Sequence, residues 1–188
     1  MGKIIVSQFL SLDGVMEAPE TWHFPYISDD MAAFTANDIN ASTATLYGRK
    51  TYEIFSGYWQ TQKNNEFGFA DHLNKMPKYV VSNTLQNTDW NNTTILRDLD
   101  AVKAMKDTVD GNIGITGSRK LIQSLMKANL VDRFQLLVHP IVLGKGRRLF
   151  TEEINTISLS LLDSKTFQSG VIALTYALAD TLTQAEDQ

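Results

Sequence analysis

Three short stretches of the sequence place glycine, hydroxyl and basic residues where an apolar run gives way to a helical pattern. The first stretch, residues 46–52, contains Gly48, Arg49, Lys50 and Thr51. Gly48 permits a tight turn, Thr51 can cap or open the helix, and the two cations add positive charge. Because the first N–H groups of a helix have no partner inside it, this turn suits an anion such as phosphate. An ordinary helix start with solvated basic residues is the alternative.

The second stretch, residues 113–120, ends a predicted strand at Thr116 and begins a predicted helix near Ser118, with Arg119 following. Gly117 between them carries no side chain, so a pyrophosphate can approach the backbone closely. The stretch lacks the GxGxxG pattern of a dinucleotide-binding fingerprint and the acidic residue that completes it. A capped helix start explains the same residues, and both interpretations stay open.

The third stretch, residues 79–84, places Ser82, Asn83 and Thr84 after a buried strand. Their hydroxyl and amide groups can hold the phosphate on a ribose. The same residue types are common in turns, so a plain turn is the alternative.

The elements that must position these stretches follow from the spacing of apolar residues. The predicted strands cover residues 4–9, 45–47, 79–82, 113–116, 134–138, 158–167 and 171–178. The predicted helices cover residues 30–39, 51–59, 99–109 and 119–129. Because strands and helices alternate and strands then dominate, we expect an α/β fold with a mixed, mostly parallel central sheet, flanking helices and a C-terminal antiparallel hairpin. Ligands of such sheets bind beyond the carboxyl ends of the strands.

The composition indicates one domain over residues 1–179 and a polar tail over residues 180–188. The chain has 188 residues, 43% of them hydrophobic, which is enough for one core. No apolar run reaches the ~18 residues that span a bilayer, and no signal-peptide pattern is present. The net charge of −4 argues against nucleic acid as a partner. With no cysteine and no histidines at metal-ligand spacing, we expect a cytoplasmic protein that binds a small molecule and no metal.

Aromatic residues form a further candidate site. Trp22, His23, Phe24, Tyr26 and Trp59 can wall a pocket for a flat ring. Ordinary core packing explains some of them equally well.

In their order along the chain, these segments resemble the dihydrofolate-reductase-like superfamily, and within it the reductase domain of riboflavin biosynthesis and its stand-alone bacterial relatives. The resemblance covers about residues 3–178. It rests on short motifs in a fixed order, which are Ser11-Leu12-Asp13-Gly14, residues 47–53, residues 78–82, residues 115–118, Leu130-Val131-Asp132-Arg133, residues 140–146 and Leu149-Phe150. The resemblance implies the three-layer fold of that superfamily.

The resemblance also implies NADPH as the cofactor. The adenosine-side phosphates would then lie near Gly48, Arg49, Lys50 and Thr51, and the adenine ribose near Ser82, Asn83 and Thr84. The pyrophosphate would lie near Thr116, Gly117, Ser118, Arg119 and Leu121. Leu12, Asp13 and Gly14 would lie in a mobile loop over the nicotinamide. One departure from the family pattern is Thr116, whose methyl group can crowd the pyrophosphate where the family usually has glycine.

A proton donor is implied in the same way, because dihydrofolate reductases carry an acid that opens the first helix four positions before an aromatic residue. Asp30 and Phe34 have this spacing, and Trp22 and Pro25 precede them. A carboxyl group in an apolar pocket has a raised pKa and can supply the proton. The alternative is that Asp29 or Asp30 caps the helix. Phe34 would line the substrate pocket with Trp22 and Trp59.

The leading hypothesis is therefore an NADPH-dependent reductase of a small heterocycle or an open-chain sugar amine. A ribosylaminopyrimidine of riboflavin synthesis and dihydrofolate are the two substrates that the resemblance suggests. The alternative is a nucleotide-binding protein without turnover that keeps the fold as a sensor or interaction module. Because the C-terminal hairpin leaves an exposed sheet edge and similar proteins often dimerise there, we expect a homodimer.

Overall fold

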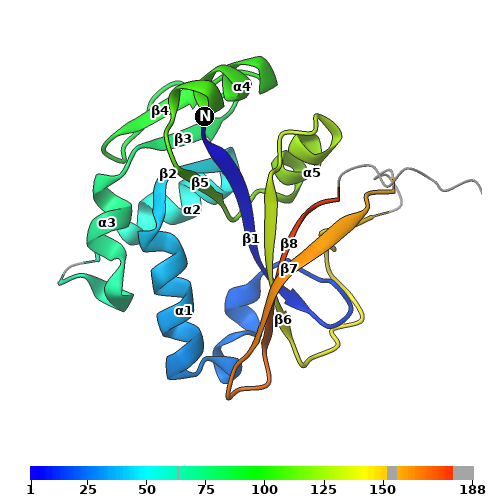
Figure 1. The fold of residues 1–188 in the computed structure, drawn as a ribbon. Coiled ribbons are helices and arrows are strands. Elements are labelled where there is room, and N and C mark those ends of the chain that lie inside the picture. The colour runs from blue at the N-terminus through cyan, green and yellow to red at the C-terminus, as the bar shows by residue number, and fades with distance from the viewer. Residues whose placement is uncertain (63, 152–155, 180–188) are drawn as a thin grey trace, which may run out of the picture.

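Eight strands form one sheet in the computed structural model, which describes residues 1–62, 64–151 and 156–179 (Figure 1). The strand order is β4-β3-β2-β5-β1-β6-β8-β7. The strands are β1 (Lys3–Ser11), β2 (Ser42–Gly48), β3 (Lys78–Val81), β4 (Thr93–Leu96), β5 (Asn112–Ile115), β6 (Arg133–His139), β7 (Leu159–Thr166) and β8 (Ile172–Leu178). The first six pair in parallel, whereas β8 runs antiparallel to β6 and β7 antiparallel to β8. The predicted mixed sheet and its C-terminal hairpin are confirmed.

Five α-helices connect the strands within the described residues. They are α1 (Asp29–Asn40), α2 (Arg49–Trp59), α3 (Ala70–Lys75), α4 (Leu99–Thr108) and α5 (Arg119–Lys127), and short 3-10 helices occur at η1 (Pro19–Thr21), η2 (Phe24–Tyr26) and η3 (Glu66–Gly68). The four predicted helices are present with ends shifted by one or two residues. The predictions missed α3 and β4, because six and four residues are too short to show a clear period. None of the described helices is long and apolar enough to cross a bilayer.

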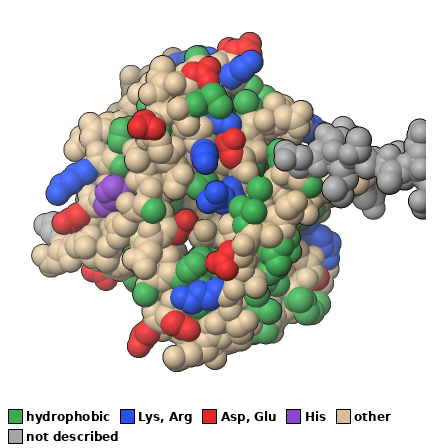
Figure 2. All heavy atoms as spheres, in the orientation of Figure 1, with side chains coloured by type: hydrophobic (Ala, Val, Ile, Leu, Met, Phe, Trp, Pro, Cys, Tyr) green, Lys and Arg blue, Asp and Glu red, His purple; other side chains and the backbone are tan. Residues whose placement is uncertain are grey.

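Helices cover both faces of the sheet, so the fold has three layers (Figure 1). On one face, Val102 of α4 and Ile122 of α5 pack against Ile4, Val6 and Leu46. On the other face, α2 and α3 pack through Tyr52 and Leu73 around Trp90. A third cluster, around Met31 of α1 and Leu137 of β6, reaches the C-terminal hairpin at Phe167. Acidic and basic side chains are interspersed over the face of the molecule that Figure 2 shows. The predicted tail, residues 180–188, lies outside the described residues.

Candidate functional site

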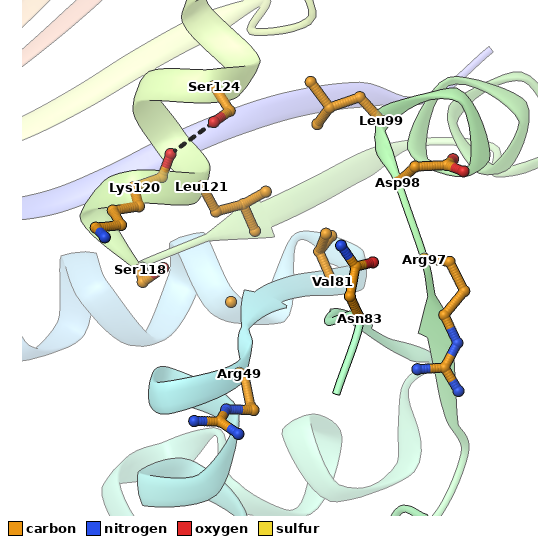
Figure 3. A pocket seen from close by; sticks show the side chains of 11 residues that line it. Arg49, Val81, Asn83, Arg97, Asp98, Leu99, Ser118, Lys120, Leu121 and Ser124 are labelled. Atoms are coloured by element: carbon orange, nitrogen blue, oxygen red, sulfur yellow. Dashed lines mark hydrogen bonds between the residues drawn. The ribbon is translucent and has the colours of Figure 1, made fainter. Parts of the chain in front are cut away.

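The three stretches that the sequence predicts to bind phosphate meet where neighbouring parallel strands of the sheet end. Strand β2 pairs on one side with β3 and on the other with β5, and all three run in parallel. Their carboxyl ends at Gly48, Val81 and Ile115 therefore lie side by side. A cavity of about 400 Å³ opens at this edge. It is lined by Gly48, Arg49, Val81, Asn83, Arg97, Asp98, Leu99, Ser118, Lys120, Leu121 and Ser124 (Figure 3).

Three cations from three different elements line this cavity (Figure 3). Arg49 begins α2, Arg97 follows β4, and Lys120 lies in the first turn of α5. Arg49 Nη1 donates to Thr84 Oγ1 at 3.1 Å. Arg97 Nη1 donates to the carbonyls of Ser82 at 2.9 Å and Leu85 at 2.7 Å, which holds its guanidinium in place. The cavity therefore carries an excess of positive charge that suits a multiply charged anion.

Asp98 is the acidic residue that lines the cavity, and it is engaged at the start of α4, away from the starts of α2 and α5. The Asp98 side chain accepts from the Ala101 N–H at 2.8 Å and so caps α4. The starts of α2 and α5 have Gly48 and Ser118 as their N-cap residues, and neither makes a side-chain capping bond. Two helix N-termini therefore keep N–H groups that no capping side chain satisfies, and both border the cavity.

The two glycines of these turns allow the turns to touch each other. The Gly48 N–H donates to the Gly117 carbonyl at 3.0 Å. A Cβ atom on Gly48 would collide with the Ser118 side chain, and one on Gly117 would lie 2.6 Å from Thr51 Oγ1. Gly117 also has a φ of +154°. The sequence suggested that glycine makes room for a pyrophosphate, whereas here each glycine first makes room for the neighbouring turn.

The cavity contains some of the residues expected at a cofactor site and omits others. Gly48, Arg49, Asn83, Ser118 and Leu121 line it, whereas Lys50, Thr51, Ser82, Thr84, Thr116, Gly117 and Arg119 do not. Thr51 does not cap α2, because the helix begins two residues earlier at Arg49. The Ser82 hydroxyl accepts from the N–H groups of Thr84 and Leu85, so it closes a turn. The cavity residues that the sequence reasoning missed are Val81, Arg97, Asp98, Leu99, Lys120 and Ser124.

The loop that begins with Leu12, Asp13 and Gly14 is tied to the segment after β6. Asp13 accepts from the Ser11 hydroxyl at 2.7 Å, from the N–H groups of Leu143 and Gly144, and from Arg148 Nη2 at 3.1 Å. These bonds, the one from Ser11 above all, hold the pKa of the Asp13 carboxyl well below its usual range. Asp13 is therefore a carboxylate that joins two loops.

The expected proton donor, Asp30, lies at the start of α1. Its carboxylate accepts from the Ser28 hydroxyl, from the Met31 N–H at 3.0 Å and from the Gln168 N–H at 3.1 Å. These hydrogen bonds, led by the one from Ser28, lower the pKa of Asp30. The environment favours a charged carboxylate that anchors α1 to the C-terminal hairpin. The raised pKa expected of a proton donor is absent, so the catalytic role of Asp30 stays a prediction.

The three expected pocket aromatics do not come together. Trp22 is buried and packs edge-on against His139, with ring centroids 5.2 Å apart. Phe34 of α1 packs against Phe167 at 5.3 Å. Trp59 lies in the separate cluster of α2 and α3, where its ring is 5.0 Å from that of Phe69. Each of the three rings therefore packs against a different aromatic partner, and they do not wall one pocket.

His139 at the end of β6 is fully buried, a feature that the sequence did not indicate. Its Nδ1 hydrogen-bonds to the Leu137 carbonyl at 2.9 Å and to the Leu10 carbonyl at 3.2 Å. Burial lowers the pKa of His139, so the ring is neutral at physiological pH and Nδ1 carries the donated proton. The ring fixes the carboxyl ends of β1 and β6 relative to each other.

The sheet order and the antiparallel C-terminal strands define a dihydrofolate-reductase-like fold. Solved structures of that kind resemble this chain. A putative riboflavin biosynthesis protein from Shewanella sp. PV-4 matches 95% of this chain and 99% of its own, with a TM-score of 0.73 and 19% identity. Dihydrofolate reductase from Enterococcus faecalis, solved with NADP(H) and RAB-propyl, matches 95% of this chain and 97% of its own, with a TM-score of 0.64 and 16% identity. At such identities these likenesses show the fold alone.

The sequence comparisons define the family. The family model described as RibD C-terminal domain matches residues 2–173. The uncharacterized protein YyaP of Bacillus subtilis is 32% identical over 180 residues, which cover 93% of this chain and 94% of that protein. The chain therefore belongs to the RibD C-terminal domain family, as the resemblance of its motifs predicted.

Proposed function

We propose that the protein is an NADPH-dependent reductase of a small heterocycle or ribosylaminopyrimidine. The observation that carries the proposal is the cavity at the carboxyl ends of β2, β3 and β5, which three cations line and two helix N-termini border. A reductase-like family and a fold shared with a dihydrofolate reductase support the same assignment.

The residues present suit the phosphate-bearing half of NADPH. Arg49 and Arg97 would pair with phosphate oxygens in a fork geometry, and Lys120 would add a point charge. Asn83 would meet the ribose side, and Leu121 would cover apolar ring surface. When bound, NADPH would supply a hydride to the carbon of a C=N or C=O bond. The chain's own task is to hold the two partners together, exclude water and deliver a proton to the heteroatom.

Nucleotide binding without turnover is the second candidate, and one observation favours it. Asp30, the acid expected to donate the proton, is held as a carboxylate. General acid catalysis contributes about 10²–10⁴-fold to a rate, so a protein with a cofactor cavity and no proton donor would bind NADPH with little turnover.

The decisive experiment follows the absorbance of NADPH with dihydrofolate and with the phosphorylated ribosylaminopyrimidine as substrate probes. A reductase consumes NADPH in proportion to one of these probes. Tight NADPH binding together with no consumption by either probe would favour the second candidate.

A further inference from the structure

The guanidinium group of Arg97 is held in a fixed position at the cavity, although the residue is exposed. Arg97 follows β4, yet its Nη1 donates to the carbonyls of Ser82 at 2.9 Å and Leu85 at 2.7 Å, in the turn after β3. The parallel pairing of β3 with β4 brings these two segments together. A guanidinium group has five N–H donors, and both hydrogen bonds of Arg97 within the described residues use Nη1. The N–H groups on Nε and Nη2 are therefore available to a ligand in the cavity.

The positive charge of Arg97 has no acidic partner within ion-pair distance in the described part of the chain, and the same holds for Lys120. By contrast, Arg49 Nε lies 3.6 Å from the Glu53 carboxylate. Asp98 lines the same cavity, but its side chain caps α4. Arg97 and Lys120 are therefore the cavity cations whose charge a bound anion would neutralise most directly.

The polar groups of the turn after β3 are already engaged with one another. The Ser82 hydroxyl accepts from the N–H groups of Thr84 at 3.3 Å and Leu85 at 3.0 Å. The Thr84 hydroxyl accepts from Arg49 Nη1 at 3.1 Å. The sequence suggested that hydroxyl and amide groups of this turn hold a phosphate on a ribose. Because the two hydroxyls have partners, a phosphate at this turn depends on the guanidinium group of Arg97.

The two sides of the cavity offer different chemistry to an anion. Figure 3 shows Arg97 and Lys120 on opposite sides, with Val81 and Leu121 between them. Lys120 lies in the first turn of α5, and the starts of α2 and α5 both lack a side-chain cap. On the Arg97 side, α4 begins with Asp98 as its cap. An anion therefore meets unsatisfied backbone N–H groups on one side and a guanidinium group on the other.

An adenosine with an anionic group on each side matches this arrangement. Its pyrophosphate would lie against the two helix starts, and its ring would lie on the apolar surface of Val81, Leu99 and Leu121. A second phosphate on the ribose would then reach Arg97. The cavity of about 400 Å³ is at the low end of ligand sites, which span roughly 300–1,000 Å³, so it suits this half of a dinucleotide.

We propose that Arg97 binds the 2′-phosphate of NADPH and determines the preference for NADPH over NADH, whereas Lys120 and the starts of α2 and α5 hold the pyrophosphate that both cofactors share. The inference rests on the proposed function, because it takes NADPH as the ligand. A guanidinium group offers a planar fork of donors that matches a phosphate group. Asp98 lines the same cavity, so removal of the Arg97 charge would leave the 2′-phosphate near an uncompensated acid.

The test compares three variants that each replace a cation by glutamine, which are Arg97→Gln, Lys120→Gln and Lys103→Gln. Glutamine retains an N–H donor for the turn carbonyls and removes the charge. Lys103 is the control, because it is exposed on α4 and does not line the cavity. Fluorescence titrations with NADPH and with NADH give the ratio of the two dissociation constants for the wild type and for each variant.

The wild type should bind NADPH about 10- to 100-fold more tightly than NADH, the range expected for a hydrogen-bonded charge. Arg97→Gln should lose this preference and keep its affinity for NADH within about threefold. Lys120→Gln should weaken both cofactors by a similar factor, and Lys103→Gln should change neither by more than about twofold. A preference that persists in Arg97→Gln overturns the proposal. An equal loss for the two cofactors in Arg97→Gln also overturns it, because that result indicates a purely structural role.

A second titration by calorimetry needs no cofactor. Adenosine 2′,5′-bisphosphate and adenosine 5′-monophosphate differ only in the 2′-phosphate. The wild type should bind the bisphosphate more tightly, and Arg97→Gln should bind the two nucleotides equally. Equal affinities in the wild type overturn the proposal. A wild type that distinguishes the two nucleotides but consumes no NADPH with either substrate probe would refute the reductase proposal and support the role of Arg97.

Discussion

Replacement of Arg49 by alanine removes one of the three cations that line the edge cavity. The Arg49 side chain is 45% exposed and lies 3.6 Å from the Glu53 carboxylate, so water and Glu53 both compete with a bound phosphate. A hydrogen bond to a charged group contributes about 1.5–3 kcal/mol, and partial exposure places this one at the lower end. A loss of about 1.5–2 kcal/mol corresponds to roughly 10- to 30-fold in the dissociation constant of NADPH.

The assay is a fluorescence titration with NADPH and NADH, run in parallel on Arg49→Ala and Lys50→Ala. Lys50 is the matched control, because it is the adjacent cation and does not line the cavity. We expect Lys50→Ala to bind NADPH within about twofold of the wild type, as for an exposed charge. Equal losses in the two variants would mean that net charge alone governs binding. An unchanged affinity in Arg49→Ala would refute the assignment of this turn.

Three further predictions concern stability and assembly. Lys78 is fully buried, and its Nζ donates to the carbonyls of Leu73, Asn74 and Met76, so Lys78→Met should cost roughly 2–3 kcal/mol in urea unfolding. Burial lowers the pKa of Lys78 from 10.5 to about 8, so the unfolded chain binds more protons than the folded chain between these pH values. The stability of the wild type relative to Lys78→Met should therefore increase as pH rises from about 8 to 10.5. A stability difference that stays constant over this range would contradict the reasoning. Asp13→Asn should lower the melting temperature at neutral pH, because it removes the carboxylate that joins the two loops. The difference in melting temperature from the wild type should vanish at a pH well below the ordinary aspartate pKa of 3.8, where the wild-type carboxylate takes up a proton. Equal melting temperatures at pH 7 would show that the loop contacts contribute nothing to stability. The homodimer stays a prediction: β7 is an edge strand with Leu161 54% exposed, so Leu161→Lys should convert a dimer to a monomer in light scattering, and a monomeric wild type would contradict the dimer.

The sequence was a good guide to the fold because most elements have a clear period. The strands of the sheet centre are long or strongly apolar, as in residues 4–9 and 134–138, and the C-terminal hairpin has a turn between two apolar runs. Strand β4 has only four residues and was missed. That omission hid Arg97, because only the pairing of β4 with β3 brings the residue after β4 to the cavity.

Site residues at strand-to-helix junctions were predictable from the sequence, whereas residues brought together by packing between distant elements were not. Gly48, Arg49 and Ser118 stand at strand-to-helix junctions, which sequence spacing reveals. His139 lies at the end of β6, and its burial and its contact with the Leu10 carbonyl depend on how β1 and β6 pair.

The central claim is that the cavity at the ends of β2, β3 and β5 binds NADPH, and a direct binding titration tests it. The wild type should quench or enhance NADPH fluorescence saturably and should bind NADPH more tightly than NADH, because the cavity offers cations to the extra phosphate. Absence of binding at millimolar NADPH, or equal affinity for the two cofactors, would contradict the account.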